Sequence, residues 1–228
     1  MTSVPVERSY PDASLSGSLT YLLMNLPLGI AGFVVLFTLF TVGISTAVVW
    51  VGVPVAAFAV LLARGAAKVE RGRVYALLNT FIPLPYRPLP LGSQKLRWLA
   101  RLRDGSTWRD IAYFFLLFPL GIIEFTLVVT FWATSLALAG LPIYYRFLPD
   151  GAYYFPGYDV RWFTVDSTVE ALPWAALGVL CIALSVALTR AMGSGHARLA
   201  MAMLGPTAAQ RRRLENDWDD AEEMSMVA

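Results

Sequence analysis

The segment Leu26-Pro27-Leu28-Gly29-Ile30 returns 92 residues later as Phe118-Pro119-Leu120-Gly121-Ile122, and this repetition decides the fold that the sequence predicts. At a spacing of 126 residues, a second register relates Leu62-Ala63-Arg64 to Leu188-Thr189-Arg190. The sequence therefore indicates two copies of one unit, each with a proline and a glycine inside its first apolar segment. Other residues recur at the 92-residue spacing: Tyr21 as Tyr113, Phe33 as Phe125, and Thr38 as Thr130.

The composition is that of a membrane protein. Of the 228 residues, 57% are hydrophobic and only 15% are charged, and the mean hydropathy is +0.58. Soluble domains usually carry about a quarter charged residues, so the excess of apolar side chains must face lipid. Residues 1–18 are polar and lack the basic and apolar regions of a secretory signal, so we expect no cleavable signal peptide.

Four apolar stretches approach or exceed the roughly 20 residues that a helix needs to cross the hydrocarbon core of a bilayer. They cover about residues 19–42, 46–63, 111–141 and 171–188. We therefore predict an all-α polytopic membrane protein with four transmembrane helices in two tandem two-helix repeats. The predicted divisions are an N-terminal segment (1–18), a membrane domain (19–206) made of repeat one (19–90) and repeat two (107–206), and a charged tail (207–228).

The distribution of Lys and Arg predicts the orientation in the membrane. Ten lie between residues 64 and 110 and five follow residue 188, whereas only two lie between 143 and 170, beside four acidic residues. Cytoplasmic connections carry the excess of Lys and Arg, so the middle loop and both termini are predicted to be cytoplasmic in a multi-pass protein of the cell membrane. The two copies should then run in the same direction, related by rotation about an axis near the membrane normal.

The basic region contains two helical patterns. Residues 64–79 and 93–103 are each predicted to form a cytoplasmic amphipathic helix, with a proline-rich strap between them, and residues 196–204 repeat the first of these. Their basic side chains should meet anionic head groups, so membrane lipids are predicted partners. Thr107 is the predicted N-cap of the third span.

The repeated Pro27-Gly29 and Pro119-Gly121 pairs are candidate hinges. A proline inside a helix removes one backbone hydrogen bond, and a glycine lets another helix approach closely. Two interpretations remain open from the sequence. The pairs form a hinge that moves when a ligand or partner binds, or they are places where kinked helices pack and do not move.

Glu124 is the one acidic residue within an apolar span. A charge near the centre of a bilayer costs at least about 2.5 kcal/mol, so residues of this kind usually serve a function. Glu124 follows Gly121 by three residues and corresponds to Gly32 of the first copy, where Asn25 is the nearest comparable polar residue. The sequence predicts either a carboxylate that responds to a proton or ligand and hydrogen-bonds Asn25, or a purely structural hydrogen bond between helices.

Nine aromatic residues fall in the predicted outside loop, 143–170. Four of them, Tyr144, Tyr145, Tyr154 and Trp162, are candidates for contact with an apolar or cationic ligand or with a partner. The alternative is an aromatic belt at the membrane interface. Trp218, among the acidic residues of the tail, is a candidate docking residue, with a solvated tail as the alternative.

The residue types needed for catalysis are scarce. The chain has one cysteine, Cys181, and one histidine, His196, and carries neither a phosphate-binding glycine loop nor a Ser/His/Asp set. We therefore expect no enzymatic activity, no metal or other cofactor, and no nucleic-acid partner.

Several short motifs resemble one known family. The most specific is Thr107-Trp108-Arg109-Asp110, and the others are Gly52-Val53-Pro54, Leu62-Ala63-Arg64, Ala76-Leu77-Leu78, Pro85-Tyr86-Arg87-Pro88 and Leu141-Pro142, with the repeated Pro-Leu-Gly segments. From about residue 18 to 206 the chain resembles the four-helix "putative sensor" domain of actinobacterial signalling proteins, which is often fused to a histidine kinase. The resemblance implies a role in sensing or signal coupling.

No kinase region follows the fourth span in this sequence, so we expect the output to pass through a separate protein, such as a kinase, a regulator or a transporter subunit. The leading interpretation is a non-enzymatic membrane sensor or signal-coupling accessory protein. The alternative is a structural subunit of a larger membrane complex such as a transporter, and the chain is also a candidate homo-oligomer.

Overall fold

Four long helices dominate the computed structural model, which describes residues 13–86, 93–157 and 161–212. All four are long and apolar enough to cross a membrane, so the predicted all-α polytopic fold with four transmembrane helices is confirmed. They are α1 (Leu15–Ser45), α2 (Gly52–Leu78), α4 (Gly105–Tyr144) and α5 (Thr168–Leu204). The shorter elements are η1 (Ala47–Val49), α3 (Gln94–Arg103), η2 (Tyr145–Phe147), η3 (Pro149–Gly151), β1 (Tyr153–Pro156) and β2 (Arg161–Val165).

Helix α2 continues through the segment that we expected to form a separate surface helix. It runs unbroken past Arg64 to Leu78 and ends where Asn79 adopts a left-handed conformation with φ 50°. The segment contains no proline, and its small apolar residues Ala67 and Val74 are fully buried, so the helix stays inside the protein. Residues 196–204 likewise form the end of α5, so of the three predicted surface helices α3 alone is separate in the described part of the chain.

Helix α4 begins earlier than predicted, and Thr107 is not its cap. The cap is Asp104, whose carboxylate accepts a hydrogen bond from the Ser106 amide at 3.0 Å. An aspartate in this position satisfies an amide that would otherwise lack a partner, so the helix can start at the next residue. The Thr107 hydroxyl accepts a hydrogen bond from Arg64 at 2.7 Å and donates one to the Arg101 carbonyl at 2.9 Å.

Helices α1 and α4 cross at the repeated Pro-Leu-Gly segments. A Cβ on Gly29 would lie 2.8 Å from the Leu117 carbonyl oxygen, and one on Gly121 would lie 2.7 Å from that of Asn25. Each glycine thus packs on the residue that stands two positions before the repeated proline of the other copy. The contact of Gly29 with Leu117 is therefore equivalent to the contact of Gly121 with Asn25, as expected for two copies related by a two-fold rotation.

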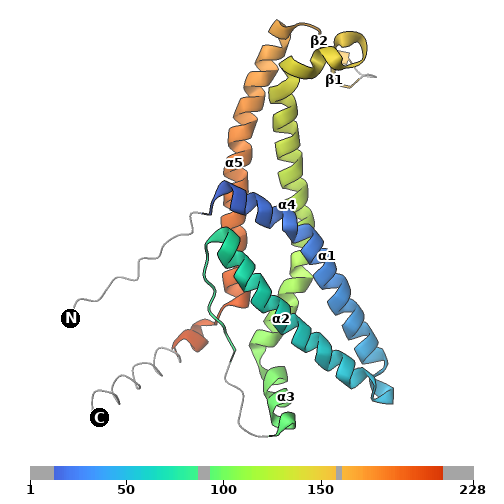
Figure 1. Ribbon diagram of the computed structural model, residues 1–228, viewed down its shortest axis with the longest axis vertical. Coiled ribbons are helices and arrows are strands. Elements are labelled where there is room, and N and C mark those ends of the chain that lie inside the picture. Colours follow the sequence, from blue (N-terminus) through green and yellow to red (C-terminus); the bar gives the residue numbers. More distant parts are fainter. Residues whose placement is uncertain (1–12, 87–92, 158–160, 213–228) are drawn as a thin grey trace, which may run out of the picture.

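The relative direction of the two copies differs from our expectation. Because Asn25 lies beside Gly121 and Gly29 beside Leu117, α1 and α4 run in opposite directions where they cross. The α1–α2 hairpin and the α4–α5 hairpin diverge from this crossing, and their turns lie at opposite ends of the molecule (Figure 1). The close approach of two glycines fixes the crossing, and charge counts in the loops carry no information about it.

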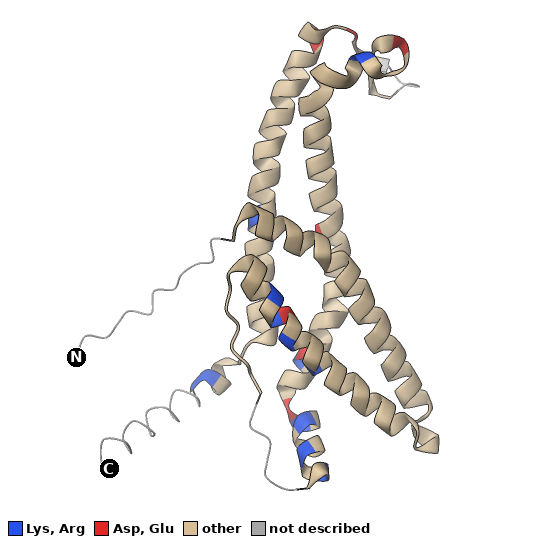
Figure 2. Cartoon of the chain, in the orientation of Figure 1, with Lys and Arg blue, Asp and Glu red and all other residues tan. Residues whose placement is uncertain are grey.

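Most charged residues lie on the segments near this crossing and below it. Figure 2 shows Lys and Arg gathered on the second half of α2 and on α3, whereas the turn of the α1–α2 hairpin carries none. The start of α1, the end of α2 and the end of α5 meet there, as the contacts of Gly17 with Leu77 and of Gly193 with Ser18 show. The first turns of α4 join α2 through the Arg71–Asp110 pair. The ends that the charge counts assigned to one side of the membrane therefore lie together.

The aromatic segment 143–170 packs on the far end of the α4–α5 hairpin. Strands β1 and β2 pair in an antiparallel two-stranded sheet, and Phe155 stacks on Trp174 with ring centroids 4.1 Å apart. Leu141, Tyr145 and Val165, the last residue of β2, form one buried cluster with Ala171. Packing, rather than free exposure, accounts for much of this aromatic content.

Candidate functional site

Glu124 lies at the contact between the two copies and is 5% exposed. One carboxylate oxygen accepts a hydrogen bond from the Asn25 side chain at 2.6 Å, the contact that the sequence suggested. The other lies 2.7 Å from Nδ1 of His196, at the end of α5. No pattern in the sequence assigned a role to His196, so its contact with Glu124 is a finding of the structure.

A second acid, Glu70 on α2, is buried close by at 4% exposure. Arg73 donates to both of its carboxylate oxygens, at 2.9 and 2.8 Å. The hydroxyls of Tyr21 and Tyr113 both donate to Oε1 of Glu70, at 2.7 and 2.9 Å. Four hydrogen bonds therefore offset the cost of burying this carboxylate.

Two further hydrogen bonds join these groups into a closed ring. Arg73 donates to the Asn25 side-chain oxygen at 2.6 Å, and the Tyr113 hydroxyl lies 3.0 Å from Nε2 of His196. We call the set the buried ring, and all four long helices contribute to it. Its members in order are Glu124, His196, Tyr113, Glu70, Arg73 and Asn25.

The ring preserves the duplication seen in the sequence. Tyr21 and Tyr113 are equivalent at the 92-residue spacing, and their hydroxyls lie 3.3 Å apart. Glu70 and His196 are equivalent at the 126-residue spacing, and each lies next to the tyrosine of its own copy. That second spacing was the available signal for His196 and Glu70. The alignment at that spacing pairs a glutamate with a histidine, and such a mismatch does not mark either residue as functional.

Counting protons restricts the state of the ring. Tyr113 has one hydroxyl proton, so when it donates to Glu70 the Nε2 of His196 must supply the proton for the contact between them. The contact of Nδ1 with Glu124 needs a second proton, on either the imidazole or the carboxyl group. The His196–Glu124 pair thus holds two protons while every bond of the ring is made, and loss of one breaks a bond.

A second polar cluster lies where α2, α4 and the end of α5 meet. Arg71 pairs with Asp110 at 2.9 Å and donates to the Leu204 carbonyl at 3.1 and 2.9 Å. Tyr86 donates to Asp110 at 2.6 Å, and the Arg64 guanidinium lies 3.9 Å above its ring. Burial raises the pKa of Tyr86 to about 12, and its hydrogen bond to the Asp110 carboxylate adds to the shift, so the hydroxyl remains a donor at neutral pH.

The other sequence candidates fall in separate places. Pro27, Gly29, Pro119 and Gly121 lie inside α1 and α4 at the crossing, one turn from Glu124 or Asn25. Tyr145 and Tyr154 are buried in the outer segment, Tyr144 is half-buried, and Trp162 is 75% exposed. None of these four aromatic residues contacts the ring, and Trp218 lies outside the described residues.

A family model described as "Putative sensor" matches residues 21–204, which include every member of the buried ring. The chain belongs to the Putative sensor family. No curated protein and no solved structure matches it. The Putative sensor match also includes Arg71, Tyr86 and Asp110, so both polar clusters lie within the family domain.

Proposed function

We propose that this Putative sensor protein is non-enzymatic, that it passes its signal to a separate protein, and that the buried ring is the element whose state it transmits. The observation that carries the proposal is closure of the ring by residues of both hairpins. Asn25, Glu70 and Arg73 belong to the α1–α2 hairpin, whereas Tyr113, Glu124 and His196 belong to the α4–α5 hairpin.

The ring is suited to couple the hairpins because its bonds between them are buried. Asn25 donates to Glu124 and Tyr113 donates to Glu70, and the Asn25 amide nitrogen also lies 3.3 Å from Nδ1 of His196. Removing one partner of a buried hydrogen bond costs about 1–3 kcal/mol. A change of this size is large enough to shift the population between two arrangements of the hairpins.

The mechanism that we propose is a pivot at the glycine contacts. Gly29 and Gly121 hold the backbones of α1 and α4 together, and neither glycine has a side chain that would lock the crossing angle. When the ring is complete, its bonds fix that angle. When a proton or ligand changes the state of Glu124 and His196, the bonds across the crossing change and the hairpins reorient.

We also propose that the protein lies in the cell membrane with both termini in the cytoplasm. The ends of the four helices that border the basic segments gather in one region, and the basic side chains concentrate there. Labelling of single cysteines placed at Gly195 and Phe147, with Cys181 replaced by alanine, tests this arrangement in intact cells. Phe147 is exposed at the end of the α4–α5 hairpin. Reagents that do not cross membranes should label Phe147→Cys and leave Gly195→Cys unlabelled, and the reverse result would overturn the orientation.

The partner is tested by purification from mild detergent. We expect one membrane or cytoplasmic protein to copurify, and its recovery should change in Glu124→Leu, which removes both bonds of Glu124 and keeps similar volume. Ser135→Ala is the matched control because it removes a buried hydrogen bond of 2.9 Å to Ser185 within one hairpin. Equal recovery of the partner with wild type, Glu124→Leu and Ser135→Ala would instead favour a structural subunit of a larger complex.

A further inference from the structure

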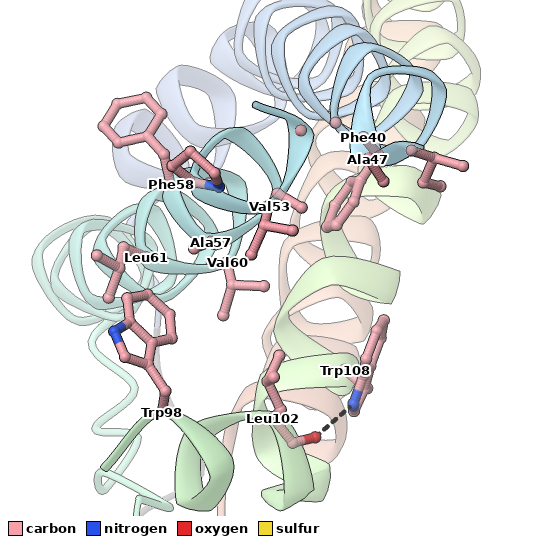
Figure 3. Close-up of a pocket in the computed structure, with 15 residues that line it drawn as sticks. Phe40, Ala47, Val53, Ala57, Phe58, Val60, Leu61, Trp98, Leu102 and Trp108 are labelled. Atoms are coloured by element: carbon pink, nitrogen blue, oxygen red, sulfur yellow. Dashed lines mark hydrogen bonds between the residues drawn. The ribbon is translucent and has the colours of Figure 1, made fainter. Parts of the chain in front are cut away.

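An apolar groove of about 830 Å³ lies apart from the buried ring, between the α1–α2 hairpin and the segment where α3 meets α4 (Figure 3). Phe40 and Val53 line it near the hairpin turn, and Leu61 lines it further along α2. Trp98 and Leu102 of α3 face it from the other side. The only hydrogen bond drawn among its lining residues joins the Trp108 indole to the Leu102 carbonyl at 2.9 Å. The groove therefore offers apolar contact and few polar groups.

Helix α3, which lines one side of the groove with Trp98 and Leu102, is strongly basic. It carries Lys95, Arg97, Arg101 and Arg103, and none of the four forms an ion pair with any residue of the described parts of the chain. Nε of Arg97 is buried and has no hydrogen-bond partner there. The Arg101 guanidinium lies 5.1 Å from the ring of Trp98, which itself lines the groove. The helix that lines one side of the apolar groove thus carries cations with no ion-pair partner among the described residues.

We propose that this groove binds one anionic phospholipid of the surrounding membrane, with an acyl chain along the apolar walls and the phosphate on the basic residues of α3. An amphiphile with an anionic head matches both halves of the surface, whereas a neutral lipid leaves the cations without a counter-charge. The proposal goes beyond the sensor function and does not depend on the buried ring.

A second copy of the chain fits this surface less well. Among the described residues, the exposed acids are Asp150, Asp166 and Glu170, and all three lie in the aromatic segment at the far end of the α4–α5 hairpin. They cannot reach α3 of a neighbour that shares the same membrane orientation. The lipid bilayer, by contrast, supplies anionic head groups next to a basic amphipathic helix.

The test uses the full chain in nanodiscs of equal parts phosphatidylglycerol and phosphatidylcholine, followed by release into detergent and native mass spectrometry. The wild type should retain one phosphatidylglycerol in preference to phosphatidylcholine. A variant with Lys95, Arg97, Arg101 and Arg103 all changed to Gln should lose that preference by about tenfold. The matched control, Arg190→Gln with Arg198→Gln, neutralises exposed residues of α5 and should keep it.

The apolar half is tested separately by filling the groove. Ala57→Phe places a ring in the space between α2 and α3 and should reduce retention of both lipids, whereas Ala183→Phe adds the same ring to an exposed site on α5 and should not. Circular dichroism of each variant confirms that it is folded. As a readout that does not depend on retention, phosphatidylglycerol with brominated acyl chains should quench wild-type fluorescence more than that of a Trp98→Phe, Trp108→Phe variant.

Three results would overturn the proposal. They are equal retention of the two lipids by the wild type, unchanged preference in the fourfold α3 variant, and a dimer of the chain that excludes lipid and is disrupted by Ala57→Phe. None of these depends on Glu124, so failure of the lipid site and failure of the sensor mechanism are distinguishable.

Discussion

The hydroxyl groups of Tyr21 and Tyr113 lie 3.3 Å apart, although 92 residues separate them in the sequence. Because these residues are equivalent in the two copies, the copies meet through the same position of each. Both hydroxyls donate to Glu70, which belongs to the first copy, but only the Tyr113 hydroxyl also lies within hydrogen-bond distance of His196. The duplicated unit has therefore become asymmetric at the place where it closes the buried ring.

Adding a methyl group to Gly121 should destabilise the protein. A Cβ there would lie 2.7 Å from the Asn25 carbonyl oxygen, which forces the two backbones apart. We expect Gly121→Ala to lower the free energy of unfolding by about 1–3 kcal/mol, as overpacking does elsewhere. Denaturation with sodium dodecyl sulfate, followed by circular dichroism, measures it.

Gly65→Ala on α2 is the control for that substitution. Nothing lies within 4 Å of a Cβ built on Gly65, and alanine favours helix more than glycine does. Its free energy of unfolding should be unchanged or higher by up to about 1 kcal/mol. Equal effects of Gly121→Ala and Gly65→Ala would contradict the close crossing of α1 and α4.

Removal of the Tyr113 hydroxyl should cost more than removal of the Tyr21 hydroxyl. Tyr113→Phe leaves His196 without its contact at Nε2 and opens the ring, whereas Tyr21→Phe leaves every bond of the ring in place. A buried group that loses its partner costs about 1–3 kcal/mol. The free energy of unfolding, measured in the same detergent, should therefore be lower for Tyr113→Phe than for Tyr21→Phe. A larger loss for Tyr21→Phe would show that the ring is not the unit that holds the helices.

The protonation of His196 can be observed directly because the chain has one histidine. Nitrogen-15 spectra of the imidazole in nanodiscs should show a proton on Nε2, either in the imidazolium ion or in the neutral Nε2–H form beside a neutral Glu124. The ring does not allow the neutral form that is protonated only at Nδ1, because Tyr113 donates to Glu70. Detection of that form as the main species at neutral pH would contradict the proton count.

Part of the fold and of the site was accessible from the sequence. Long apolar stretches predicted the four spans. Glu124 stood out as the one acid within a span, and Asn25 was predicted as its partner. Glu70 and Arg73 were missed because, with Arg64 and Arg71 nearby, their segment has the composition of a solvated cytoplasmic helix. Burial of those charges depends on partners from the other helices, which no local pattern reveals.

The direction of the hairpins was also beyond the sequence. Loop charges report the side of the membrane on which a segment lies, but they do not report how two hairpins cross. That angle follows from contact between Gly29 and the Leu117 backbone, two residues 88 positions apart. The repeated glycines were visible as candidate hinges, but their partners across the crossing were not.

The central claim is that the buried ring fixes the relative arrangement of the two hairpins. Its most direct test is the distance between spin labels at Val48, on the α1–α2 turn, and Phe147, at the end of the α4–α5 hairpin, in nanodiscs with Cys181 replaced by alanine. Both side chains are over 80% exposed, at 88% and 81%, so the labels should not disturb packing. Glu124→Gln, which can still accept from Asn25 and donate to Nδ1 of His196, should keep the wild-type distribution. Glu124→Leu should shift or broaden it, and the same distribution in wild type and Glu124→Leu would contradict the claim.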